Sequence, residues 1–141
     1  MKLYGPIILI DDDQDDLEII EEVLNRNSVQ SADIRTFTDC YAALKYLETT
    51  SEKPFLVICD INIPGMNGME FRKIVDENEA LRRKSIPFVF FSSAAIGMQV
   101  TAAYEMTVQG FFLKRNSLAE MEETIKRILD YWMYCVHPNS N

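Results

Sequence analysis

Short apolar runs rich in β-branched and aromatic residues alternate with helical patterns along the whole chain. This alternation is typical of stacked βαβ units, which build a parallel sheet with helices on its faces. The expected strands are 7–10, 34–37, 55–59, 88–91 and 111–113. The first, third and fourth runs are continuously apolar, as strands buried on both faces should be. We therefore predict an α/β fold with a doubly wound, five-stranded parallel sheet.

Amphipathic patterns between these runs predict the crossover helices. Apolar residues recur at intervals of three and four positions in the last helix, at Leu118, Met121, Ile125, Ile128 and Trp132. Similar spacing indicates earlier helices at Leu17, Ile20 and Leu24, at Ala43, Tyr46 and Leu47, and less regularly at Met69 and Ile74. A capping box at Ser117 and Glu120 should begin the last helix. We expect the fourth helix, around 98–106, to be the most mobile, because four residues in or beside it dilute the helical propensity, namely Gly97, Val100, Thr101 and Thr107.

The 141 residues suffice for one compact domain and leave no length for a second core. We expect a single domain over 5–134, followed by a short polar tail over 135–141 and no output domain. His137 lies in this tail, where we expect a solvated side chain without a role.

Hydropathy, charge and cysteine spacing exclude several classes of protein. No apolar run approaches the roughly 20 residues that span a bilayer, and 1–10 is too short and interrupted for a signal peptide. We therefore expect a cytoplasmic protein without a membrane partner. The formal net charge of −8 argues against nucleic acid, which is bound by clustered lysine and arginine. The odd number and wide spacing of the cysteines indicate reduced packing residues, at Cys40, Cys59 and Cys135.

Polar or charged residues follow four of the expected strands. Asp11 and Asp12 end the first, Asp60 the third, Ser92 the fourth and Lys114 the fifth. In open parallel sheets, ligands bind beyond the carboxyl ends of the strands. We therefore expect these side chains to meet at one rim of the sheet.

The three carboxylates at this rim would repel one another unless a cation neutralised them. Oxygen ligands without histidine or cysteine favour Mg²⁺, with Mn²⁺ as a second choice. Asp60 is then a plausible nucleophile for a phosphoryl group, with Lys114 and Ser92 contacting phosphoryl oxygens. The other aspartates of the acidic run are explained more simply as the solvated start of a helix. Asp13 would cap this helix, and Asp15 and Asp16 would interact favourably with the positive end of its dipole.

These motifs resemble those of bacterial response-regulator receiver domains of the CheY-like, stand-alone type. The resemblance covers roughly residues 5–130 and lies in four segments, which are Ile7-Ile-Leu-Ile-Asp-Asp12, Val57-Ile-Cys-Asp-Ile-Asn-Ile-Pro-Gly-Met-Asn-Gly68, Ser92 and Phe111-Phe-Leu-Lys114. It implies a flavodoxin-like (βα)5 fold with strand order 2-1-3-4-5. It also implies a response regulator of a two-component phosphorelay, which catalyses only its own phosphorylation and dephosphorylation.

The resemblance assigns roles to particular residues. Asp60 would accept the phosphoryl group from a histidine kinase or phosphotransfer protein. Asp12 would bind Mg²⁺ directly, Asp11 would act largely through water, and Asn62 would contribute its backbone carbonyl. Ser92 would be the switching hydroxyl, and Phe111 would be the aromatic side chain that follows it inward. Lys114 would be the cation beside the phosphate, and Gly68 would supply backbone freedom in the acceptor loop. Phe111 is explained equally well as part of an apolar strand.

The chain departs from the family pattern at two positions. Arg115 stands where proline usually follows the lysine, which puts the geometry of that loop in question. Ser93 stands where a smaller residue is common, which would narrow access to the acceptor. A downstream protein is expected to bind the face of the fourth and fifth helices. Homodimers are a further possibility, because the end of the last helix carries surplus apolar residues at Tyr131, Tyr134, Cys135 and Val136.

Three other functions compete with this interpretation. An aspartate-dependent magnesium phosphohydrolase also uses a nucleophilic aspartate, but it needs a second aspartate where this chain has Asn62. A flavin- or nucleotide-binding module is disfavoured because the chain lacks GxGxxG and GxxxxGK[ST] motifs. A receiver that only docks to partners is disfavoured by the intact set of site residues.

Overall fold

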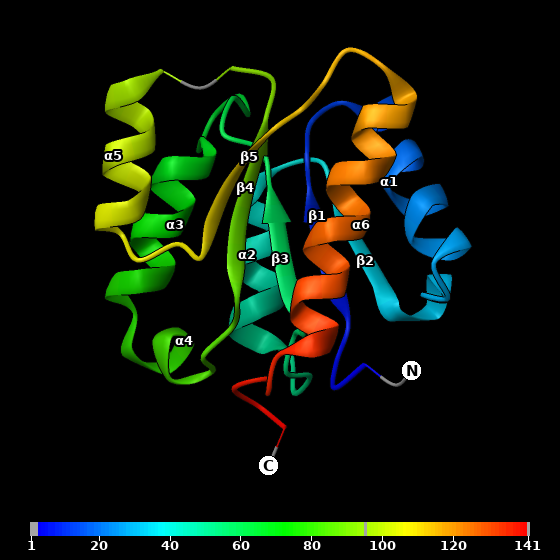
Figure 1. Ribbon diagram of the computed structural model, residues 1–141. Helices are drawn as coiled ribbons and strands as arrows, with labels where there is room; N and C mark the ends of the chain where they lie inside the picture. Colours follow the sequence, from blue (N-terminus) through cyan, green and yellow to red (C-terminus); the bar gives the residue numbers. More distant parts are fainter. Residues whose placement is uncertain (1–2, 95, 141) are drawn as a thin grey trace.

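The computed structural model describes residues 3–94 and 96–140 and shows a parallel sheet with helices on both faces (Figure 1). Its strands are β1 (Ile7–Ile10), β2 (Ile34–Phe37), β3 (Leu56–Cys59), β4 (Phe88–Ser92) and β5 (Gly110–Leu113). They pair in the order β2-β1-β3-β4-β5, and all pairs are parallel. The predicted fold class and strand order are confirmed, and the strand bounds differ from the prediction by one residue at β3, β4 and β5.

Helices cover both faces of the sheet, so the three central strands are buried throughout. One face packs against α1 (Gln14–Arg26) and α6 (Leu118–Tyr134). The other face packs against α2 (Cys40–Thr49), α3 (Gly68–Glu77), α4 (Glu79–Arg83) and α5 (Gly97–Glu105). The sequence had not suggested α4, which is only five residues long. A short 3-10 turn (Ser31–Asp33) precedes β2.

Polar side chains begin most of the helices. Asp13 accepts hydrogen bonds from two backbone N–H groups of the first turn of α1, as predicted. Ser117 accepts from the Glu120 N–H at the start of α6. In the described part of the chain, the complete capping box is found instead at the start of α3, where Asn67 and Glu70 bond to each other's backbone.

Two of the expected core positions are wrong. The side chain of Leu118 is 56% exposed because it stands at the very start of α6, before the helix meets the sheet. Ile74 of α3 is also exposed, whereas Phe71 and Val75 of that helix are buried. The fourth helix of the sequence prediction corresponds to α5, in which Ala103 is the one buried residue of the described segment.

The prediction of a solvated His137 is wrong. The ring is 2% exposed and stacks on Phe55, with 4.7 Å between the ring centroids. Its Nδ1 accepts a hydrogen bond from the Asn139 N–H at 3.0 Å, so Nε2 carries the hydrogen that is donated to the Phe55 carbonyl at 2.7 Å. The Asn139 side chain also donates to the Lys84 carbonyl. The tail is therefore folded back against the start of β3.

Every helix of the described residues is too short or too polar to cross a membrane. The three cysteines carry free thiols, and Cys40 and Cys59 are buried in the core as expected.

Candidate functional site

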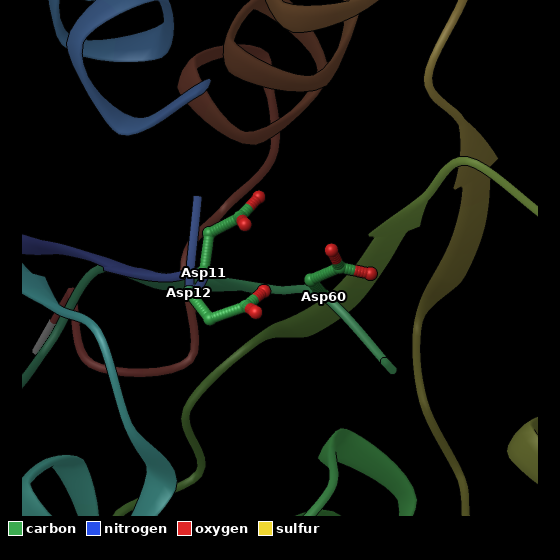
Figure 2. Close-up of side chains that lie close together, drawn as sticks. All are labelled: Asp11, Asp12 and Asp60. Carbon is green, nitrogen blue, oxygen red and sulfur yellow. The ribbon is translucent and has the colours of Figure 1, made fainter. Parts of the chain in front are cut away.

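Three aspartates converge at the carboxyl ends of β1 and β3. Figure 2 shows the side chains of Asp11, Asp12 and Asp60 turned toward a common space, and one oxygen from each lies within 4.8 Å of the others. Asp11 and Asp60 are buried, while Asp12 is exposed. The sheet itself fixes the two buried residues, because the Asp11 N–H donates to the Phe37 carbonyl and the Asp60 N–H to the Ile10 carbonyl.

Lys114 brings a cation to this cluster from the end of β5. Its Nζ lies 2.5 Å from Asp11 Oδ2, 2.8 Å from Asp16 Oδ2 and 3.0 Å from Asp60 Oδ2. The backbone holds the residue in place, because the Lys114 N–H donates to the Ser92 carbonyl at 2.8 Å. Burial alone would lower the pKa of Lys114, but its hydrogen bonds to these carboxylates outweigh burial and raise that pKa. The lysine is therefore charged.

One ammonium group is too little charge for this site. Burial raises the pKa of Asp11 to about 6, although the Lys114 hydrogen bond partly opposes the shift. The site holds four carboxylates, from Asp11, Asp12, Asp16 and Asp60, and Lys114 contacts all of them except Asp12. A divalent cation relieves such an excess of negative charge, and three closely spaced oxygen donors suit Mg²⁺ or Mn²⁺. The residues present therefore fit a hard divalent metal.

The backbone around Asp60 is closely packed. Asp60 Oδ1 accepts from the Ile61 N–H at 2.7 Å and lies 3.4 Å from the Asn62 N. A Cβ atom on Gly68 would lie 2.2 Å from the Asp60 carbonyl oxygen, so glycine is required there by close approach. The expectation that Gly68 supplies backbone freedom is therefore wrong. The glycine with a positive φ, at 78°, is Gly65 in the same loop.

Ser92 ends β4 beside β3, and its hydroxyl is unusual. The side chain is completely buried, yet Oγ is the buried side-chain oxygen without a hydrogen-bond partner in the described structure. A buried hydroxyl that lacks a partner costs free energy, so this group calls for a physical explanation. Phe111 is half-buried against the Phe90 ring, at 5.9 Å between centroids.

The structure corrects the prediction for Asp16 and answers the question that Arg115 raised about the loop after Lys114. Asp16 contacts Lys114, although the acidic run suggested a solvated role for it. The signal in the sequence was its place in the first turn of a helix that begins four residues after the end of a strand. Arg115 does not prevent Lys114 from reaching the carboxylates, and no peptide bond between described residues is cis. Arg115 lines an open cleft of about 530 Å³ together with Asp16, Ser93 and Lys114.

Comparisons with known proteins agree with this geometry. The sequence model of the response regulator receiver domain matches residues 7–126. Response regulator Rcp1 of Synechocystis sp. is 26% identical over 135 residues, covering 92% of this chain and 90% of that protein. The Mn²⁺-bound structure of Rcp1 superposes with a TM-score of 0.79 and 26% identity, covering 94% of this chain and 96% of that one.

The fold is also that of the phosphorylated cyanobacterial phytochrome response regulator RcpA. That structure has a TM-score of 0.84 and 23% identity, covering 96% of this chain and 99% of that one. Receiver domains bind Mg²⁺ or Mn²⁺ at an acidic pocket and exchange signals with histidine kinases or phosphotransfer proteins. The chain belongs to the response regulator receiver domain family, and its role is that of a signalling domain in a two-component phosphorelay.

Proposed function

We propose that Asp60 accepts the phosphoryl group and that Mg²⁺ is bound by Asp11, Asp12, Asp60 and the Asn62 carbonyl. The observation that carries this proposal is the surroundings of Asp60. Its buried carboxylate lies 3.0 Å from the Lys114 ammonium and within 4.8 Å of two further carboxylates. This arrangement combines a nucleophile, a cation and a metal-binding set at the end of one central strand.

Phosphoryl transfer to Asp60 forms one bond and breaks one bond. A carboxylate oxygen attacks phosphorus, and the bond from phosphorus to the donor's nitrogen or oxygen breaks. The leaving group keeps that electron pair: it is the imidazole of a phosphohistidine, which takes a proton from solvent, the carboxylate of an acyl phosphate, or ammonia when phosphoramidate is the donor. The protein positions the reactants and stabilises charge on the phosphoryl oxygens through Lys114, while a bound Mg²⁺ supplies further charge neutralisation.

Ser92 and Phe111 are the proposed switch. The unpaired Ser92 hydroxyl can donate to a phosphoryl oxygen on Asp60, which gives this buried group the partner that it lacks. The half-buried Phe111 lies on the neighbouring strand β5, and it would follow the movement of Ser92 inward. An aspartate-dependent phosphohydrolase is not favoured, because Asn62 occupies the position where that class needs its acid/base.

Phosphorylation with a small donor tests the acceptor. Wild type incubated with phosphoramidate and Mg²⁺ is expected to gain one phosphoryl group by intact-mass measurement, and hydroxylamine should remove it as it removes an acyl phosphate. Asp60→Asn should remain folded and unlabelled, since the amide is nearly the same size and is no nucleophile. Asp15→Asn removes the same charge from an exposed position and should label normally. Full labelling of Asp60→Asn, or a label stable to hydroxylamine, contradicts the proposal.

We also propose that α5 and α6 present the surface for a downstream protein. On α5 and the residue before it, three large apolar side chains are more than half exposed, namely Ile96, Met98 and Tyr104. At the end of α6 the side chains of Tyr131 and Tyr134 and the adjacent Val136 are also exposed, which supports self-association or docking there. Sedimentation of the unmodified and phosphorylated protein over a range of concentrations distinguishes self-association from docking. A monomer in every condition contradicts the homodimer.

A further inference from the structure

Three carboxylates contact Lys114, and that of Asp16 is the one that does not directly follow a strand. Its carboxylate Oδ2 lies 2.8 Å from Lys114 Nζ, and its side chain is 23% exposed. Asp16 is the third residue of α1, and its backbone N–H donates to the side chain of Asp13, which caps the helix. The first turn of α1 therefore holds Asp16 where its carboxylate reaches the lysine.

The three carboxylates around Lys114 have different chemical surroundings. Asp11 and Asp60 also belong to the cluster whose oxygens suit a divalent metal. A bound metal draws on those same oxygens, and phosphorylation turns the Asp60 carboxylate into an acyl phosphate. Asp16 lies outside the cluster, so its carboxylate stays free to pair with Lys114 when the other two are engaged.

A lysine at this position needs a lasting partner. The side chain of Lys114 is 8% exposed, and burying its ammonium is unfavourable without compensating carboxylates. Its stem has four rotatable carbons, so a lysine that lost its partners would turn toward water in the adjoining cleft.

We propose that Asp16 is a positioning residue that holds Lys114 Nζ beside the acceptor while Asp11 and Asp60 bind metal and phosphoryl group. This inference rests on the proposed role of Asp60 as acceptor. Asp16 itself touches neither the phosphoryl group nor the metal, and it acts only through the lysine.

The chain offers a matched control in the next residue. Asp15 lies in the same first turn, carries the same charge and is exposed, and it is absent from the ion pairs of Lys114 in the described structure. A substitution of Asp15 changes net charge and helix dipole as a substitution of Asp16 does, but it leaves the lysine contact intact.

The test compares labelling rates with saturating phosphoramidate and Mg²⁺. Asp16→Ala is expected to lower the maximal rate about three- to tenfold, as for loss of a charge-assisted hydrogen bond. Asp16→Asn, which keeps an oxygen acceptor for Lys114, should recover much of the rate. Asp15→Ala should stay within about twofold of wild type, as expected for an exposed charge.

A double-mutant cycle separates positioning from a general effect on structure. In the Lys114→Ala background, Asp16→Ala should change the rate less than about twofold, because the group through which it acts is gone. Equal slowing in both backgrounds, or equal slowing by Asp15→Ala, overturns the inference. If wild type were not labelled at all, the proposed function would fail separately. The same cycle on the free energy of unfolding would then decide, since additive effects of the two substitutions also overturn the inference.

Discussion

Removing the hydroxyl of one residue, Ser92, should affect the stability of the protein and its binding of a phosphoryl group in different ways. Because Oγ is buried without a partner, Ser92→Ala removes an unsatisfied group and should leave the free energy of unfolding unchanged or raise it by about 1 kcal/mol. The same substitution should weaken binding of beryllofluoride, a phosphoryl mimic, about tenfold, since one donor to it is lost. Urea denaturation and a beryllofluoride titration in Mg²⁺ measure the two effects.

Ser51→Ala is the matched control for this prediction, because Ser51 lies in the loop before β3, whereas Asp60 follows the other end of that strand. Ser51 is exposed, and its substitution should alter neither quantity appreciably. A Ser92→Ala protein that is less stable than wild type by more than 1 kcal/mol, taken as about the worth of one hydrogen bond, shows that the hydroxyl has a partner in the resting protein.

Two glycines allow a paired experiment on the acceptor loop. A Cβ on Gly68 would overlap the Asp60 carbonyl oxygen at 2.2 Å, so Gly68→Ala should cost about 1 to 3 kcal/mol of unfolding free energy. Nothing lies within 4 Å of a Cβ on Gly97, and Gly97→Ala in α5 should be neutral or stabilise by less than about 1 kcal/mol. Thermal unfolding of both variants measures the difference, and equal stability would contradict the close packing of α3 against the acceptor.

The sequence was enough to place the site residues that directly follow a strand. It was not enough to place a site residue whose position depends on the course of a loop and the orientation of a helix. Asp11, Asp12 and Asp60 were predictable because a parallel sheet brings its carboxyl ends to one rim. Asp16 was not, because its contact with Lys114 depends on how the loop after β1 turns the first turn of α1. An aspartate in the first turn of a helix is already explained by its interaction with the helix dipole, so there was no reason in the sequence to expect its contact with Lys114.

At the scale of elements, periodicity located the strands and most helices but not the faces of every helix. The central strands were clear because both of their faces are buried, and a continuous apolar run has no other simple explanation. The short α4 was missed because five residues are too few to show a period. The tail was misjudged because its polar composition says nothing of His137, whose partner Phe55 lies 82 positions away.

The tail should contribute measurably to stability. His137→Ala removes a ring stacked on Phe55 and two hydrogen bonds, and we expect a loss of about 2 kcal/mol in the free energy of unfolding. Val136→Ala is the control, because that side chain is 91% exposed and its loss should cost less than about 0.5 kcal/mol. Urea denaturation of both variants tests this, and equal stabilities would show that the tail does not dock in solution.

The metal site is a property of the whole molecule, because only the folded sheet brings residues separated by about fifty positions to within 4.8 Å. A ligand that binds only the folded state stabilises it by RT ln(1 + [L]/Kd), or about 2.7 kcal/mol at a hundredfold excess over Kd. Mg²⁺ should therefore raise the free energy of unfolding of the wild type progressively. The measurement belongs at about pH 8, where Asp11, with its pKa raised to about 6 by burial, is ionised and able to bind metal.

Two substitutions decide whether this stabilisation comes from the aspartate cluster. Asp12→Asn removes one charge from it and should abolish most of the dependence on Mg²⁺, since a hard divalent ion binds a carboxylate far better than an amide. Asp15→Asn removes an equal charge from the exposed first turn of α1 and should leave the Mg²⁺ dependence unchanged. Urea denaturation across a series of Mg²⁺ concentrations gives all three curves. If Asp12→Asn is stabilised as strongly as the wild type, the cation binds elsewhere and the three-aspartate site is wrong.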